Sequence, residues 1–94
     1  MTGTTSRKTS NPLKLHLGCG SIHLNGFINV DMVKTHAVDV VMDIRHLRYD
    51  NETVETIYAS HVLEHFPHGE IPKLLMEWHR VLKIGAIAEF QVPN

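Results

Sequence analysis

The sequence has almost no cysteine, no excess of charge and no long hydrophobic run. Cys19 is the only cysteine in 94 residues, so an intramolecular disulfide is impossible and a reducing compartment suits the chain. The formal net charge of −1 gives no electrostatic reason to expect nucleic acid or an anionic membrane as a partner. No apolar run approaches the ~18–20 residues of a membrane span. We therefore expect a cytoplasmic protein that binds neither nucleic acid nor a membrane.

The N-terminal segment also lacks an apolar stretch. M-T-G-T-T-S-R-K-T-S-N-P is polar and rich in Ser and Thr, without the apolar core of a secretory signal. We predict that residues 1–12 are disordered. Residues 13–94 contain no internal repeat and are predicted to form one α/β domain, which is small enough that its core is modest.

Short apolar segments follow one another from residue 13. Residues 13–17 alternate leucine with lysine and histidine, which is the period of a strand, and stop at a glycine turn, G-C-G. We expect His16, inside this strand, on a partly exposed face. The next predicted strands are residues 27–31, 38–43 and 54–59.

Residues 70–83 have the period of an amphipathic helix. Their apolar residues fall at i, i+3, i+4, i+7, i+10 and i+11, which makes one continuous stripe. Pro72 falls in the first turn, where a missing N–H does no harm, and Gly85 is expected to supply a left-handed stop. Residues 86–92 then predict a fifth strand.

Short strands with a long helix before the last one predict an α/β fold with a mostly parallel, five-stranded sheet. In such sheets ligands bind beyond the carboxyl ends of the strands. The unusual residues of the chain fall at those ends: the glycine turn at residues 18–20, Asp31, Asp43, and residues 60–65. The sequence therefore predicts a binding site along this edge of the sheet.

The residue types at this edge suit a nucleoside. Gly18 and Gly20 let the backbone turn with positive φ and let a ligand come close, although the turn alone could be an ordinary end of a strand. Asp31, at the tip of the second strand, can accept both hydrogens of a ribose diol, and Asp43 is placed to meet the base. Either aspartate alone could cap a loop. Together with the glycines they indicate an adenosine-shaped pocket.

Residues 61–65, H-V-L-E-H, fit the inverted zincin pattern H-x-x-E-H. On an α-helix the two imidazoles would share a face and could hold zinc. Pro67 disfavours helical geometry in the residue before it, and a catalytic zinc needs three protein ligands, for which only His68 is near. A zinc hydrolase built on this segment is therefore the less favoured alternative, and we predict no metal site.

Five segments together resemble the class I S-adenosylmethionine-dependent methyltransferases. They are L-H-L-G-C-G-S, G-F-I-N-V-D, V-D-V-V-M-D-I-R, I-Y-A-S-H-V-L-E-H-F and R-V-L-K-I-G-A, in that order. The similarity covers about residues 13–94 and is closest to small stand-alone enzymes of glycan and natural-product pathways. It implies a Rossmann-like fold, S-adenosylmethionine as the cofactor, and in-line transfer of a methyl group to a small-molecule or glycan-type acceptor.

The resemblance also implies a role for each residue of the first two strand ends. Gly18, Cys19 and Gly20 would form the turn under the methionine part of the cofactor. Asp31 would hold the ribose hydroxyls. Met32 would lie beside the adenine.

The remaining roles implied by the resemblance lie further along the same edge. Asp43 and Ile44 would flank the adenine, with the carboxylate facing its amino group, and Ser60 and His61 would lie close to the sulfonium. Because methyl transfer depends mostly on holding donor and acceptor in line, a general base matters only if the acceptor must lose a proton. The candidates for that base, on the substrate side, are His61, Glu64 and His65.

Three departures from the family pattern stand out. Ten residues separate Gly20 from Asp31, too few for the usual helix between the first two strands, so one face of the sheet should be thinly covered there. The K-P-G-G of the family is K-I-G-A here. The chain stops at Asn94, after the fifth predicted strand, where family members continue.

From these departures we expect a truncated form of the fold that lacks the C-terminal strands. Its open edge near residues 86–92 would invite pairing with a second copy of the chain. A non-catalytic module that binds S-adenosylmethionine or a nucleotide is the alternative to an enzyme.

Overall fold

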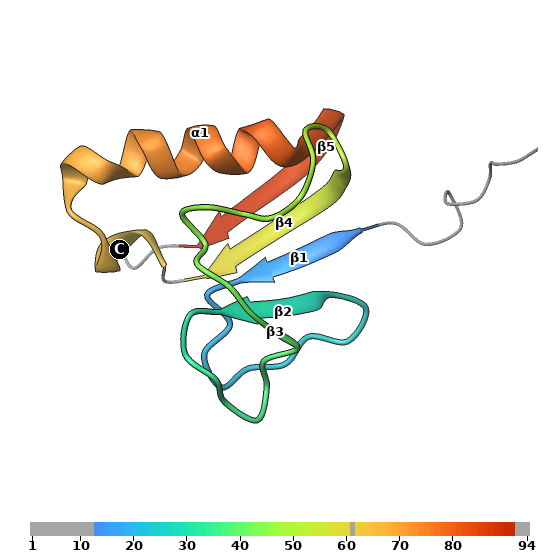
Figure 1. The fold of residues 1–94 in the computed structure, drawn as a ribbon, viewed down its shortest axis with the longest axis vertical. Coiled ribbons are helices and arrows are strands. Elements are labelled where there is room, and N and C mark those ends of the chain that lie inside the picture. Colours follow the sequence, from blue (N-terminus) through green and yellow to red (C-terminus); the bar gives the residue numbers. More distant parts are fainter. Residues whose placement is uncertain (1–12, 61, 92–94) are drawn as a thin grey trace, which may run out of the picture.

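Five strands form one sheet in the described part of the chain (Figure 1). The computed structural model describes residues 13–60 and 62–91, with side chains described as far as residue 86. The strands are β1 Lys14–Leu17, β2 Ile28–Asp31, β3 Val40–Val41, β4 Val54–Ser60 and β5 Leu82–Gln91. Their order is β3-β2-β1-β4-β5, and all neighbours are parallel. The predicted α/β fold with a five-stranded parallel sheet is confirmed, while the predicted disorder of residues 1–12 lies outside the described residues.

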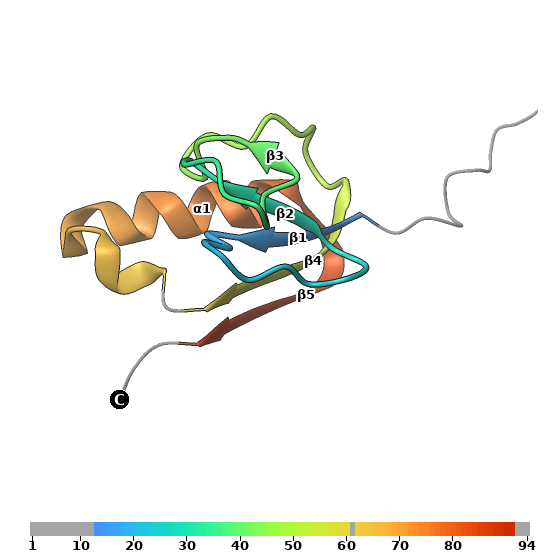
Figure 2. The same ribbon diagram turned by 90° about the horizontal axis from the view of Figure 1, so that it is seen from below.

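The helix α1, Ile71–Val81, covers one face of the sheet (Figures 1 and 2). Leu74 and Trp78 on this helix are buried in the same core cluster as Leu15 on β1 and Ile57 on β4. Because alternate residues of a strand point to opposite faces, the strands present leucine, isoleucine and valine to α1. The predicted apolar stripe of the helix is therefore the main cover of this face.

Polar side chains of α1 hold the loop that follows β3 by hydrogen bonds. The Arg80 guanidinium donates to Leu47 O at 2.9 Å and to Tyr49 O at 3.0 Å. Leu47 N donates to the Glu77 carboxylate at 2.8 Å, and Arg80 also binds that carboxylate at 2.8 Å. The hydrogen bonds from Arg80, followed by that from Leu47, lower the pKa of Glu77 below its usual value. This network keeps the loop after β3 against the helix.

The opposite face of the sheet has a different composition, and no helix of the described residues covers it. His16, Asn29 and Tyr58 are neighbours in one row across β2, β1 and β4. The connection between β1 and β2 runs over this face as turns, as the short spacing predicted. His16 is only 3% exposed and binds Asn29 Oδ1 at 2.8 Å, so the expectation that it is partly exposed was wrong.

The C-terminal end of α1 also differs from the prediction. The helix ends at Val81, because Leu82 is extended with ψ of 138° and pairs with Val54 on β4. Gly85 has φ of +84° but lies inside β5, where the register between β4 and β5 is irregular. The left-handed glycine therefore accommodates a bulge in the strand and does not stop the helix.

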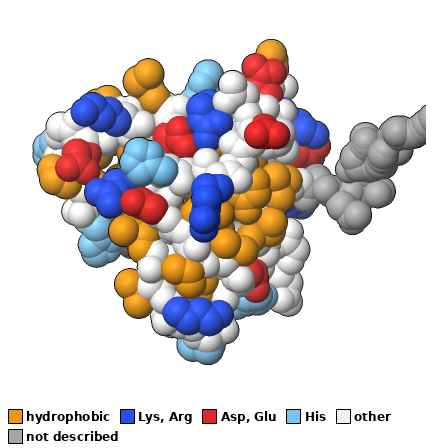
Figure 3. Space-filling model, viewed as in Figure 1, with side chains coloured by type: hydrophobic (Ala, Val, Ile, Leu, Met, Phe, Trp, Pro, Cys, Tyr) orange, Lys and Arg blue, Asp and Glu red, His pale blue; other side chains and the backbone are white. Residues whose placement is uncertain are grey.

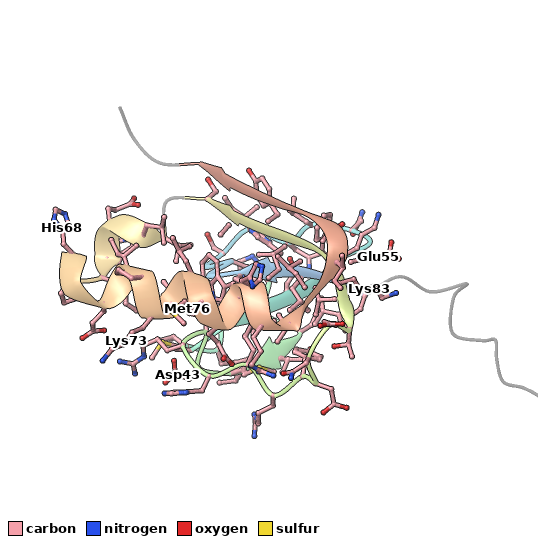
Figure 4. All side chains as sticks on the ribbon, turned by 90° about the horizontal axis from the view of Figure 1, so that it is seen from above. Asp43, Glu55, His68, Lys73, Met76 and Lys83 are labelled. Atoms are coloured by element: carbon pink, nitrogen blue, oxygen red, sulfur yellow. The ribbon has the colours of Figure 1, made fainter. Side chains whose placement is uncertain are left out.

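Charged side chains of both signs are interspersed over the face of the molecule shown in Figure 3. At the amino ends of the strands, Lys83 Nζ lies 3.5 Å from Glu55 Oε2, far from Asp43 at the opposite end (Figure 4).

None of the helices in residues 13–60 and 62–91 has the length and hydrophobicity needed to cross a membrane.

Candidate functional site

A cavity of about 290 Å³ lies at the carboxyl ends of the strands. Its walls come from the glycine turn, from the tip of β2, from the loop after β3 and from the segment after β4. The lining residues are Gly18, Gly20, Asp31, Met32, Ile44, Val62, His65 and Phe66. The structure thus brings together six of the residues that the sequence predicted for a site. A larger cavity of about 380 Å³ at the far end of α1 contains none of them.

The glycine turn leaves room for a ligand at one of its two glycines. Gly18 has φ of +67°, and a Cβ there would lie 2.6 Å from the buried side chain of Val62, so packing requires glycine. Gly20 has φ of +58°, but a Cβ there would meet nothing within 4 Å. Gly18 N donates to Val30 O at 2.8 Å, which ties the turn to β2. The turn is therefore fixed on one side and open on the other, where the cavity lies.

The Asp31 carboxylate is oriented by the backbone around it. Its Oδ2 accepts from Gly20 N at 2.7 Å, and its Oδ1 accepts from Met32 N at 2.7 Å. A carboxylate has about four acceptor positions, so both oxygens keep lone pairs for hydroxyl groups in the cavity. A carboxylate with free lone pairs beside a cavity can accept hydrogen bonds from a ribose diol, so the residues present are compatible with S-adenosylmethionine.

The segment after β3 contributes one cavity residue. Ile44 lines the cavity, and its carbonyl accepts from Trp78 Nε1 at 2.9 Å, which ties it to the core. The Asp43 carboxylate does not line the cavity, and Arg45 Nε and Nη2 both donate to it at 3.0 Å. These bonds also hold the pKa of Asp43 below its usual value. Asp43 keeps a side chain that is 35% exposed at the rim.

Cys19 is buried between the two glycines and does not line the cavity. It forms a small apolar cluster with Ala37 and Val38. Burial, and then the nearby carboxylates of Asp31 and Asp39, raise the pKa of the Cys19 thiol above its ordinary value. The thiol stays protonated at neutral pH, so it packs and is not a nucleophile.

The segment after β4 reaches the cavity through His65. Ser60 ends β4 and does not line the cavity, while His61 lies outside the described residues. Glu64 and His65 lie on one turn of 3₁₀ helix, and Glu64 is exposed. The turn ends at Phe66, which is extended, as expected before a proline.

The single 3₁₀ turn also bears on the zincin pattern. An i, i+4 pair of histidines shares a face only on an α-helix, and residues 63–65 do not form one. Across residues 13–60 and 62–91 no group of three His, Cys, Asp or Glu side chains is arranged to hold a metal.

Two apolar cavity residues were not among the predicted site residues. Val62 is 5% exposed and packs on Gly18, and Phe66 forms part of the wall next to His65. The signal that could have found them is the apolar character of V-L-E-H-F just after a strand that ends at the site. These residues add apolar surface to a cavity whose lining also contains the Asp31 carboxylate.

The fold is Rossmann-like, with a parallel sheet, a glycine turn after β1 and a carboxylate at the tip of β2 beside the cavity. A family model described as a methyltransferase domain matches residues 25–90. The chain therefore belongs to this family, the class I S-adenosylmethionine-dependent methyltransferases, whose members use S-adenosylmethionine as methyl donor. A search of curated proteins and a search of solved structures each found no match.

Proposed function

We propose that this chain binds S-adenosylmethionine in the cavity at the carboxyl edge of the sheet and transfers its methyl group to a small-molecule or glycan-type acceptor. The observation that carries the proposal is the oriented carboxylate of Asp31, which faces the same cavity as the open side of Gly20. A nucleoside with a positively charged tail suits a site whose charged wall is a carboxylate.

The proposed cofactor contacts begin at the first two strand ends. Asp31 accepts hydrogen bonds from both ribose hydroxyls, and Met32, which is 45% exposed, lies along the adenine. Gly18, Cys19 and Gly20 support the methionine part, with the open side of Gly20 next to it. The backbone contacts of the carboxylate are already made, so binding costs little reorganisation.

The proposed contacts continue along the loops after β3 and β4. Ile44 packs on the adenine. Asp43, which does not line the cavity itself, would have to reach the adenine amino group from outside the lining, with the acceptor capacity that Arg45 leaves free. Ser60 ends β4, and in this proposal Ser60 and the next residue in the sequence, His61, serve the reacting end of the cofactor. S-adenosylmethionine supplies an electrophilic methyl group, and these residues hold it in line with the acceptor.

A proton has to leave the acceptor if it is a hydroxyl or an ammonium group. His65 is the candidate base that lines the cavity, and Glu64 stands one residue before it. His61, which follows Ser60 in the sequence, is the third candidate. An imidazole or carboxylate at this wall can take the proton as the methyl group is transferred.

The cofactor site is tested by calorimetry with S-adenosylmethionine and S-adenosylhomocysteine. We expect the parent chain to bind both, and an Asp31→Asn variant to bind them about 10-fold to 100-fold more weakly, because a hydrogen bond to a charged group is worth ~1.5–3 kcal/mol. Asp50→Asn is the matched control, since Asp50 lies in the loop before β4 and outside the cavity.

Two results would count against the proposal. A parent chain that binds neither ligand contradicts the cofactor site, and equal affinities of the parent and Asp31→Asn contradict the role of the carboxylate. Methyl-transfer assays over a panel of hydroxyl and amine acceptors then separate an enzyme from a module that binds the cofactor without turnover.

The edge of β5 is the second surface for which we propose a partner. Among the described strands β5 pairs only with β4, so the far side of this ten-residue strand presents backbone groups for pairing. We propose that a second copy of the chain pairs there, near residues 86–92, because open edges favour such contacts. Sedimentation velocity over a range of protein concentrations measures it, and the mass of a single chain at every concentration would exclude it.

A further inference from the structure

No helix follows the glycine turn in this chain. In Rossmann-like sites the first strand normally leads through such a turn into a helix, which anchors it and orients its backbone amides. Here residues 21–27 contain only turns and irregular backbone before β2 begins. A glycine with positive φ has wide conformational freedom, so Gly20 needs another restraint to keep one geometry.

That restraint comes from both sides of Gly20. Its N–H donates to Asp31 Oδ2 at 2.7 Å, and its carbonyl accepts from the Thr35 hydroxyl at 2.5 Å. The direction of the second bond is settled, because a carbonyl only accepts and the hydroxyl must therefore donate. The Cys19 thiol also lies 3.6 Å from this carbonyl, but a thiol is a weak donor. The two strong bonds fix the peptide groups on either side of the Gly20 Cα.

Thr35 is itself held in place by the segment after β2. Its Oγ1 accepts from Ala37 N at 3.1 Å, and Val38 N donates to its carbonyl at 3.2 Å. Ala37 and Val38 are buried against Cys19, in the middle of the glycine turn. Lys34 Nζ donates to Val38 O at 2.7 Å and closes the segment. This short turn therefore packs on the glycine turn by apolar contact and by hydrogen bonds.

We propose that Thr35 is a positioning residue for the cofactor site: its hydroxyl holds Gly20 in the geometry that orients the Asp31 carboxylate and leaves the open side of the turn to the ligand. The inference rests on the proposed function, since it concerns the same site. Thr35 does not line the cavity and acts through Gly20. In this chain the segment at residues 34–38 takes over the anchoring of the glycine turn.

The test compares Thr35→Ala with Thr35→Ser, two variants that differ by one hydroxyl group. We expect Thr35→Ala to weaken the binding of S-adenosylhomocysteine about 5-fold to 10-fold, and Thr35→Ser to stay within about 2-fold of the parent. Thr35→Cys is a second variant that keeps a side chain of similar shape with a weak donor, and we expect it to behave like Thr35→Ala. Calorimetry below the unfolding transition of each variant provides the affinities.

Thr53→Ala is the matched control. The Thr53 hydroxyl also donates to a backbone carbonyl, that of Asp50, at 2.8 Å, but at a distance from the cavity. A purely structural effect of losing such a bond would lower the unfolding temperature in both alanine variants and leave the affinity unchanged.

The outcomes separate this inference from the proposed function. A parent chain without affinity for the ligand overturns both. A parent that binds, together with a Thr35→Ala variant of equal affinity, overturns only the role of Thr35. Equal weakening in Thr35→Ala and Thr35→Ser also overturns it, because the hydroxyl would then not be the group that matters.

Discussion

One face of the sheet is covered by a helix and the other by a loop, and the two covers are held by different interactions (Figure 2). On the helix side, Trp78 and Leu74 bury apolar surface against Leu15 and its neighbours. On the loop side, the row of residues under the cover contains His16 and Asn29. The helix is therefore held on the sheet mainly by burial of apolar area, and the loop mainly by hydrogen bonds.

Asn29 makes most of the hydrogen bonds that hold the loop between β1 and β2 (residues 21–27, the polar cover) on this face of the sheet. Its Oδ1 accepts from Leu24 N at 2.9 Å and binds His16 Nδ1 at 2.8 Å, while its Nδ2 donates to Leu24 O at 3.1 Å and to Phe27 O at 3.2 Å. It also donates to the Asp39 carboxylate at 2.9 Å. The side chain is fully buried, and an unpaired amide there would be costly. One satisfied amide thus orders a loop too short to form a helix.

The largest effect is expected on the helix side. Leu74→Ala should lower the free energy of unfolding by ~2–5 kcal/mol, because it leaves a cavity in the core. Met76→Ala is the matched control: Met76 lies on the outer side of the same helix and is 72% exposed (Figure 4). Its loss should change stability by less than ~0.5 kcal/mol. Urea denaturation followed by circular dichroism measures both, and similar losses in the two variants would contradict the division between the faces of α1.

A smaller effect is expected on the loop side. Asn29→Ala should cost about 1–3 kcal/mol, because it leaves the half-buried backbone groups of Leu24 and the buried His16 without their partner. Asn25→Ala, in the same loop but exposed, is the control and should be close to neutral. Hydrogen exchange should show faster exchange in residues 21–27 of the Asn29 variant with unchanged protection in α1. Equal loosening of loop and helix would mean that the two covers are not independent.

The smallest effect concerns the carboxylate at the edge of the polar cover. Hydrogen bonds from Asn29, first from its backbone N–H and then from its side chain, lower the pKa of Asp39 below its ordinary value. The folded chain therefore binds this proton more weakly than the unfolded chain. The stability that Asp39 contributes is complete above the unfolded-state pKa of about 3.9 and is lost as the pH falls through the lower folded-state pKa.

Unfolding free energies of the parent and of Asp39→Asn, measured from about pH 3 to about pH 7, check this dependence. The parent should be the more stable chain at neutral pH, and its advantage should shrink in acid. In the Asn29→Ala background the pH dependence of the difference should be smaller. A difference between parent and variant that is constant with pH would show that the carboxylate is not bound as described.

Much of the fold could be predicted from the sequence, because the spacing of apolar residues within one strand or one helix is a local pattern. Residues 13–17 alternate, and residues 14–17 of them form β1. The apolar stripe of residues 70–83 predicts α1, but not the residue at which this helix ends. Leu82 fits both the stripe and a strand, so only the presence of β4 beside it decides that it is extended. His16 was misplaced for a similar reason: alternation shows that it faces away from the leucines, but not that Asn29 and the loop bury it.

The candidate site was predictable to the extent that it depends on strand ends. Asp31 and the glycine turn were placed correctly at one edge, because the carboxyl ends of parallel strands meet there. Thr35 carries no motif, and its contact with Gly20 depends on how the segment after β2 folds back.

The sequence by itself determined the order of strands and helix, the edge of the sheet at which the candidate cavity lies, and the family to which the chain belongs. These follow from the spacing of apolar, glycine and acidic residues along the chain. Only the tertiary structure decided that Asn29 orders the face without a helix and that Thr35 holds Gly20. Such contacts join residues from different elements, and hydrogen bonds of that kind depend on distances that no local pattern encodes.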